Sequence, residues 1–262
     1  MPIKMKRRAS TRLSRFFAAV RDHGSPDSLS DTRCTGSTTT LLAGGCIWLL
    51  VMAGTAGAET PAAGAGMGAA QETVVFRDDF TGTTLRPEWQ LLNEDADRWT
   101  FIDNDYLLFI TTSTGQGRKN TLRYEEDLPE NYAIVLKVVH PPASGDQDLQ
   151  LEVWRDGKNG LVLWWTGSGA IGFDKHLRGE RNRIEADTGR IARDKPLYLR
   201  LKKQGIEYTA SWSLDGTSWS NVGTHLFLNL NGREPSFSTA NFRYSPPEVG
   251  VRFDFVEIRR LP

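Results

Sequence analysis

Aromatic and hydrogen-bonding residues recur at every second position in four stretches between residues 148 and 213. The positions between them are apolar, and alternate residues of a β-strand point to opposite faces. One face of one sheet would therefore carry rings beside carboxyl, amide and hydroxyl groups, which suit the apolar face and the hydroxyls of a sugar. The sequence predicts a carbohydrate-binding sheet face, formed by Glu152, Trp154, Trp164, Tyr198, Arg200, Glu207 and Thr209.

The two tryptophans of this face have a second interpretation. Residues 174–196 are polar and are predicted to form a long loop at the rim of the sheet. In this alternative, Trp154 and Trp164 pack beneath the loop and bind nothing. The two interpretations differ in whether the rings remain open to a ligand.

Three side chains are candidates for catalysis. Glu152 and Glu207 are expected on the same polar face, and two carboxyl groups about 5 to 9 Å apart can hydrolyse a glycosidic bond. His176 is the third candidate, although a lone histidine is more often a surface residue. The chain has no G-x-S-x-G, H-E-x-x-H, P-loop or post-strand G-x-G-x-x-G motif. Binding is therefore favoured, with a glycoside hydrolase or polysaccharide lyase as the alternative.

These residues must be positioned by strands, and the clearest run is Leu197 to Gly223. It reads as three antiparallel strands, with Gly205 and Gly216 where hairpin turns need a positive φ. Strands are expected at 73–80, 88–93, 98–103, 105–113, 119–126, 132–140, 148–155, 160–166, 169–174, 197–203, 206–213, 218–223 and 248–260. Such short, regularly spaced strands predict an all-β, two-sheet antiparallel β-sandwich.

Three motifs resemble those of a known family. Residues 213–219 (SLDGTSW) resemble the "SxDGxxW" hairpin of concanavalin A-like jelly-roll domains, which include DUF1349 and the C-terminal accessory domain of family 43 β-xylosidases. Residues 76–82 with Leu85 and Trp89 resemble the opening strand of such domains, and 251–258 resembles the closing strand. The resemblance spans roughly residues 73–260, and it implies a jelly roll, a carbohydrate ligand and a partner glycosidase.

The same resemblance bears on catalysis and on metal binding. Related sandwich glucanases carry E-x-D-x-x-E on one strand, and the nearest string here, 185–190 (EADTGR), lacks the second glutamate. The first and last strands of such domains run side by side, which would bring Asp78, Asp79 and Asp254 together. Some of these domains hold a structural Ca²⁺ there, so these residues are candidate calcium ligands. The alternative is that they pair with Arg77 or Arg252.

Charge and cysteine content exclude several classes. The chain has 32 basic and 32 acidic residues, and eight Lys/Arg and three Asp lie in residues 1–40. Residues 41–58 are uncharged, so 24 basic and 29 acidic residues remain in 59–262. This negative balance argues against nucleic acid as a partner. Both cysteines precede residue 59, so the predicted sandwich, 73–262, has no disulfide and no cysteine nucleophile.

The first 72 residues are predicted to direct export. Residues 1–40 form a basic, disordered lead, 41–58 an apolar core ending in a signal-peptidase site, and 59–72 an Ala/Gly-rich linker. The expected location is therefore periplasmic or extracellular. If 41–58 is retained instead, it would anchor the protein in a membrane, as an interaction subunit of a membrane complex. A lipobox around Cys46 fits less well, because the apolar run continues beyond the cysteine.

Overall fold

A computed structural model describes residues 71–112, 118–142, 144–228, 230, 234–241 and 247–262. The lead, the apolar segment and almost all of the linker lie outside these residues, so the expectations for them stay predictions. The described residues form strands and loops throughout. None of them belongs to a helix with the length and apolar character needed to cross a membrane.

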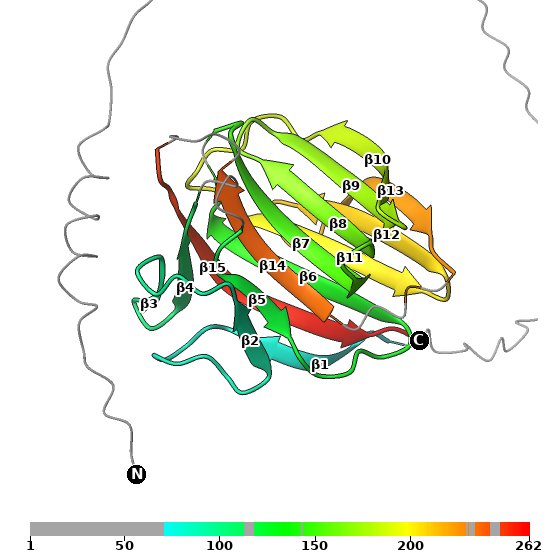
Figure 1. The fold of residues 1–262 in the computed structure, drawn as a ribbon, viewed down its shortest axis with the longest axis horizontal. Coiled ribbons are helices and arrows are strands. Elements are labelled where there is room, and N and C mark those ends of the chain that lie inside the picture. Colours follow the sequence, from blue (N-terminus) through cyan, green and yellow to red (C-terminus); the bar gives the residue numbers. More distant parts are fainter. Residues whose placement is uncertain (1–70, 113–117, 143, 229, 231–233, 242–246) are drawn as a thin grey trace, which may run out of the picture. The chain divides into compact units, whose positions relative to one another are not determined.

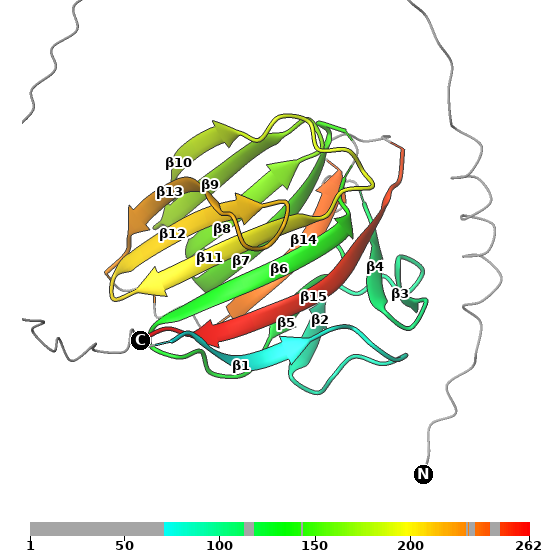
Figure 2. The same cartoon turned by 180° about the vertical axis from the view of Figure 1, so that it is seen from behind.

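The strands form two antiparallel sheets, as the sequence predicts (Figures 1 and 2). The eight-stranded sheet has the order β13 (Ser220–Leu226), β12 (Glu207–Ser213), β11 (Leu197–Gln204), β6 (Tyr132–His140), β15 (Gly250–Arg260), β4 (Tyr106–Ile110) and β3 (Trp99–Ile102), with β1 (Thr73–Asp78) also paired to β15. The seven-stranded sheet has the order β10 (Glu180–Asp187), β9 (Ala170–Leu177), β8 (Asn159–Thr166), β7 (Gln147–Asp156), β14 (Glu234–Asn241), β5 (Thr121–Tyr124) and β2 (Trp89–Leu92).

The core between the sheets is built from alternate residues of the long strands. Leu149 and Leu151 on β7 and Leu199 and Leu201 on β11 have at most 1% of their surface exposed. Trp165 on β8 packs with the same cluster and is fully buried. Burial of side chains of this size contributes about 1.5–3 kcal/mol each. The inward half of each predicted alternation therefore holds the two sheets together.

The predicted three-stranded meander is present as β11, β12 and β13. Gly205 and Gly216 have φ of 56° and 74°, the left-handed conformation that these turns require. In the second turn, Asp215 Oδ1 accepts hydrogen bonds of 2.7 Å from the backbone amides of Thr217 and Ser218. These bonds hold the pKa of the Asp215 carboxyl well below its usual range.

The assignment of the predicted ligand strands to one sheet is wrong. β7 and β8 belong to the seven-stranded sheet, whereas β11 and β12 belong to the eight-stranded sheet (Figures 1 and 2). β11 pairs with β6 along its length, from Leu197 opposite Val138 to Lys203 opposite Tyr132. The outer faces of the two pairs of strands thus lie on opposite sides of the sandwich, with the core between them.

Two strands were not predicted from the sequence. The segment 174–196, expected as a loop, begins with the end of β9 and continues through β10, which pair from Asp187 opposite Ala170 to Glu180 opposite Leu177. β10 is an edge strand with mostly exposed side chains, so it lacks an apolar alternation. β14 is rich in small residues and inserts between β7 and β5.

Candidate functional site

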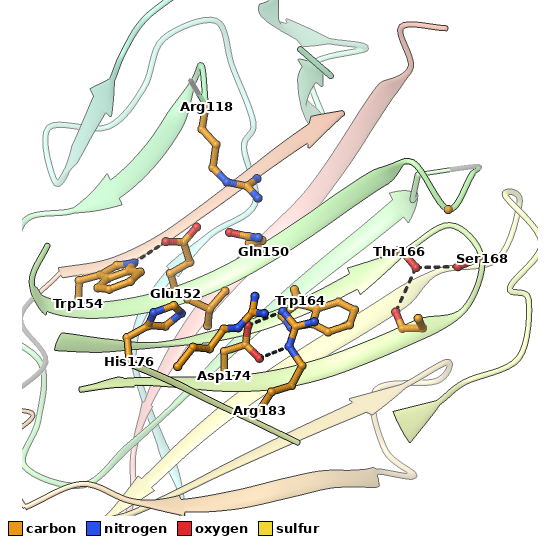
Figure 3. Close-up of a pocket in the computed structure, with 14 residues that line it drawn as sticks. Arg118, Gln150, Glu152, Trp154, Trp164, Thr166, Ser168, Asp174, His176 and Arg183 are labelled. Carbon is orange, nitrogen blue, oxygen red and sulfur yellow. Dashed lines mark hydrogen bonds and ion pairs between the residues drawn. The ribbon is translucent and has the colours of Figure 1, made fainter. Parts of the chain in front are cut away.

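The outer face of the seven-stranded sheet carries a pocket of about 610 Å³ (Figure 3). We call this surface the pocket face. Its lining comes from β7 to β10 and the segments beside them: Arg118, Gly145, Gln150, Glu152, Trp154, Val162, Trp164, Thr166, Ser168, Ala170, Asp174, His176, Arg181 and Arg183. Alternation explains why the lining residues of β7, β8 and β9 meet, since they are the outward neighbours of inward core residues.

Strand register arranges the pocket residues in rows across the sheet. The first row runs from Trp154 through Gly160 and His176 to Arg181. A second row runs from Glu152 through Val162 and Asp174 to Arg183. A third runs from Gln150 through Trp164 and Gly172 to Glu185. Each of the first and third rows therefore combines a tryptophan with a glycine on the next strand.

The Trp154 ring lies over the backbone of Gly160. A Cβ at Gly160 would be 2.2 Å from Cε3 of the ring, so the indole occupies the space that a side chain would take. Trp154 Nε1 donates a 2.5 Å hydrogen bond to Glu152 Oε2, and the ring centroid is 5.2 Å from that of His176. The ring is half-buried. One indole face is thus supported by the sheet, and the ring is held in place at its edge.

The Trp164 ring lies over Gly172 in the same way, but it is also covered from outside. A Cβ at Gly172 would be 2.2 Å from Cζ2 of the ring, and the Arg183 guanidinium carbon lies 4.5 Å from the ring centroid. Only 9% of Trp164 is exposed. The prediction that Trp164 offers an open ring is therefore wrong. The alternative, packing beneath the segment 174–196, holds for this residue because Arg183 belongs to that segment.

Glu152 is a buried carboxyl at the floor of the pocket. Its side chain accepts hydrogen bonds from Trp154 Nε1 and, at 3.5 Å, from Ser238 Oγ. Burial raises the pKa of Glu152, while the nearby Arg118 opposes that rise. A carboxyl group in this setting retains its proton to a higher pH than an exposed glutamate does.

Two ion pairs flank Glu152. Arg118 donates to both carboxylate oxygens of the fully buried Asp148, at 3.0 and 2.5 Å, and Gln150 Nε2 donates to the same carboxylate at 2.7 Å. Arg183 donates to both oxygens of Asp174, at 2.7 and 2.8 Å. Such bidentate pairs are geometrically specific and strong where they are desolvated. Figure 3 shows the pair of Arg183 and Asp174. They fix two guanidinium groups at opposite sides of Glu152.

His176 lies beside the Trp154 ring on β9. Burial lowers the pKa of His176, Asp174 opposes the change, and Arg181 and Arg183 add to it. The imidazole is therefore neutral at pH 7 and can donate through one nitrogen and accept through the other. Figure 3 shows it among the residues that line the pocket, near Trp154 and Glu152.

Four of the predicted ligand residues lie on the opposite side of the molecule. Tyr198, Arg200, Glu207 and Thr209 belong to β11 and β12, on the outer face of the eight-stranded sheet. Arg200 lies 4.1 Å from the Trp219 ring centroid. These residues are not brought together with Trp154 and Trp164, and the prediction of one shared ligand face is wrong.

The proposed catalytic pair of Glu152 and Glu207 is wrong for the same reason. The two residues lie in different sheets, which are stacked about 10 Å apart, and their side chains point outward in opposite directions. Glu152 shares its row with Asp174 instead, with Val162 between them.

The three predicted calcium ligands have other partners. Asp78 is buried and accepts hydrogen bonds from Trp89 Nε1 at 2.7 Å and from the amide of Phe80 at 2.9 Å. Asp79 pairs with Arg77 at 2.6 Å, as the alternative predicted, and Asp254 pairs with Lys137 at 2.7 Å. These carboxylates do not fit a calcium cage. Across the described ranges, no three His, Cys, Asp or Glu side chains are grouped as a metal site.

Several pocket residues were missed from the sequence. Asp148 lies outside the pocket lining but holds Arg118 there, and it has the same parity on β7 as Gln150 and Glu152, so the alternation itself contained that signal. Arg181 and Arg183 lie on β10, which was read as a loop. Arg118 precedes β5 by a few residues, and no local pattern connects it to Asp148, thirty positions later.

The fold is shared with solved structures. The GH43 protein BlXynB from Bacillus licheniformis superposes with a TM-score of 0.58 at 18% identity, over 70% of this chain and 38% of that chain. The xylan β-1,4-xylosidase from Bacillus halodurans gives 0.58 at 15% identity, over 70% and 39%. The Bacillus licheniformis β-glucanase gives 0.54 at 12% identity, over 70% of this chain and 96% of that chain.

These comparisons define a class of fold. The protein has a concanavalin A-like jelly-roll β-sandwich, as in the β-glucanase. It spans about two fifths of the length of the two GH43 chains, so it corresponds to one part of them. No protein-family model matches the chain, and no curated protein matches it by sequence.

Proposed function

We propose that the pocket face binds a carbohydrate. The observation that carries this proposal is the half-buried Trp154 ring, which is supported on one face by Gly160 and lies beside Glu152 and His176. A pyranose can stack its apolar face on such a ring while its hydroxyls exchange hydrogen bonds with the neighbouring polar groups. The site is thus smaller than the sequence predicted, with one open ring in place of three.

The fold comparisons support the same ligand class. The neighbours include a xylan β-1,4-xylosidase and a β-glucanase, whose names refer to polysaccharides. At 12–18% identity they establish the fold alone, so the substrate class rests on the pocket.

A glycan array probed with the full-length protein tests the proposal. Trp154→Ala removes the ring without touching either bidentate ion pair. We expect it to reduce binding about tenfold, because a large aromatic side chain loses its whole contact area with the ligand. Tyr198→Ala is the matched control, since Tyr198 is an aromatic residue on the outer face of the other sheet. Equal binding by wild type and Trp154→Ala would exclude the pocket face as the site.

Hydrolysis of the bound glycan is a second candidate function. It is favoured by the raised pKa of Glu152, a property of a general acid, and by Asp174 in the same row. Their Cα atoms are two strand spacings apart, about 10 Å, which allows the wider carboxyl separation of an inverting enzyme. Against it, both Asp174 oxygens already accept hydrogen bonds from Arg183.

A reducing-end assay separates binding from hydrolysis. If the pocket is catalytic, bound oligosaccharides are cleaved by the wild type, and Glu152→Gln abolishes cleavage while it preserves the side-chain shape and hydrogen bonding. If the pocket only binds, products do not accumulate with either protein, and the bound glycan is recovered intact.

We also propose that residues 41–58 direct the export of the protein. The basic lead, the apolar core and the small residues Ala56 and Ala58 support it. N-terminal sequencing of the mature protein distinguishes cleavage from retention, because a start at Glu59 means that the apolar segment has been removed. A mature protein that still contains residues 41–58 would instead favour the membrane-held interaction subunit.

A further inference from the structure

Among the described residues, one arginine of the pocket lining is not paired with a carboxylate. Of the three lining arginines, Arg118 is paired with Asp148 and Arg183 with Asp174, each through two hydrogen bonds. The Arg181 side chain is exposed, and it has neither an ion pair nor a hydrogen bond with any part of the chain that the structure describes. Arg181 is thus the cation of the pocket that remains available to a ligand.

The strand register fixes the backbone position of Arg181 on the pocket face. Arg181 lies directly opposite His176 on β9, and the same row continues through Gly160 to Trp154. Side chains directly opposite each other in a ladder point to the same face. The row spans three strand spacings, about 14 Å between the Cα atoms of Trp154 and Arg181. The length of the row therefore suits a short oligosaccharide that contacts both ends.

A second hydrogen-bond donor in the pocket lacks an acceptor. Trp164 Nε1 is buried and has no hydrogen-bond partner among the residues that the structure describes. The ring is 9% exposed and lines the pocket beneath Arg183. Buried donors are normally satisfied, so this one indicates a place for an acceptor oxygen. Trp164 Nε1 and the Arg181 guanidinium are thus two donors of the pocket lining without an acceptor among the described residues.

We propose that the preferred ligand is an acidic oligosaccharide whose uronic acid carboxylate binds Arg181, while a neighbouring sugar ring stacks on Trp154. This inference rests on the proposed carbohydrate function and specifies its ligand class. A guanidinium matches a planar carboxylate through two parallel hydrogen bonds, which neither a hydroxyl nor a neutral ring can provide. The neutral imidazole of His176 lies between the two contacts and can bond either a hydroxyl or a ring oxygen.

Matched pairs of oligosaccharides test this inference by titration calorimetry on the full-length protein. Each pair has the same backbone with and without one uronic acid, for example a xylo-oligosaccharide with and without a glucuronic acid branch. We expect the acidic member to bind at least tenfold more tightly in low salt, with the difference shrinking as salt rises. Arg181→Ala should abolish the difference by lowering the affinity for the acidic member.

Two controls keep the outcomes separate. Arg181→Lys retains the charge without the bidentate geometry and should retain only part of the preference. Lys202→Ala makes the same charge change on the outer face of the eight-stranded sheet and should have no effect. Equal affinity for both members of every pair would overturn the acidic specificity while the carbohydrate function stands. If no member of any pair binds, both proposals fall.

Discussion

The glycine beneath Trp154 provides the most direct test of the pocket geometry. In Gly160→Ala, the new methyl carbon would lie 2.2 Å from Cε3 and 2.5 Å from Cδ2 of the indole. Carbon atoms in contact are about 3.5–4.0 Å apart, so the ring must retreat by about 1.3 Å or more. That movement breaks or lengthens the hydrogen bond from Trp154 Nε1 to Glu152. Overpacking of this kind costs about 1–3 kcal/mol.

Thermal unfolding measures this cost, and a glycan titration measures the effect on binding. For a domain of this size we expect the Tm to fall by roughly 3–9 °C. Gly157→Ala is the control, because a Cβ there has no atom within 4 Å and Gly157 does not have a left-handed φ. In a Trp154→Ala background, Gly160→Ala should cost almost nothing. A Tm for Gly160→Ala equal to that of Gly157→Ala would refute the placement of the ring over the strand.

Three further predictions concern the floor of the pocket. Burial raises the pKa of Glu152 in the folded protein above the usual value of 4.5. Between these two pKa values the folded state binds more protons than the unfolded state, so the wild type should lose stability with rising pH relative to Glu152→Gln. A difference in the free energy of urea unfolding that stays constant across pH would contradict this. Arg118→Met leaves the buried Asp148 carboxylate without its cation and should lower the free energy of unfolding by about 3–5 kcal/mol. A loss below about 1 kcal/mol would contradict the burial of this ion pair. Gly172→Ala should destabilise more than the Gly160 variant in the same thermal assay, because Trp164 is covered and cannot swing outward.

Much of the fold could be predicted because it depends on local pattern. The alternation along β11 and β12 gave both strands, their turn at Gly205 and their buried side. The two strands that were not predicted are those without an apolar alternation. β10 is an edge strand that buries little, and β14 presents small residues, so neither shows the apolar period that identifies a strand.

The pocket was predicted only in part, for a different reason. Glu152, Trp154 and Trp164 were assigned to an outward face, and they lie on one. Their expected companions Tyr198 and Arg200 are outward as well, but on the other sheet. The true companions, among them Arg118 and Arg183, come from a preceding segment and from an unrecognised strand. Their contacts join residues far apart in the sequence, which no single stretch encodes.

The sequence by itself determined that this chain forms a sandwich of antiparallel strands, and it determined which side of most strands is buried. Both follow from the period of two along each strand, which is the same whichever strand lies alongside. Only the tertiary structure decided which strands share a sheet, because β11 pairs with β6 through a backbone ladder that is indifferent to side-chain identity. That choice placed Trp154 and Tyr198 on opposite sides of the molecule and left Arg181 beside the pocket.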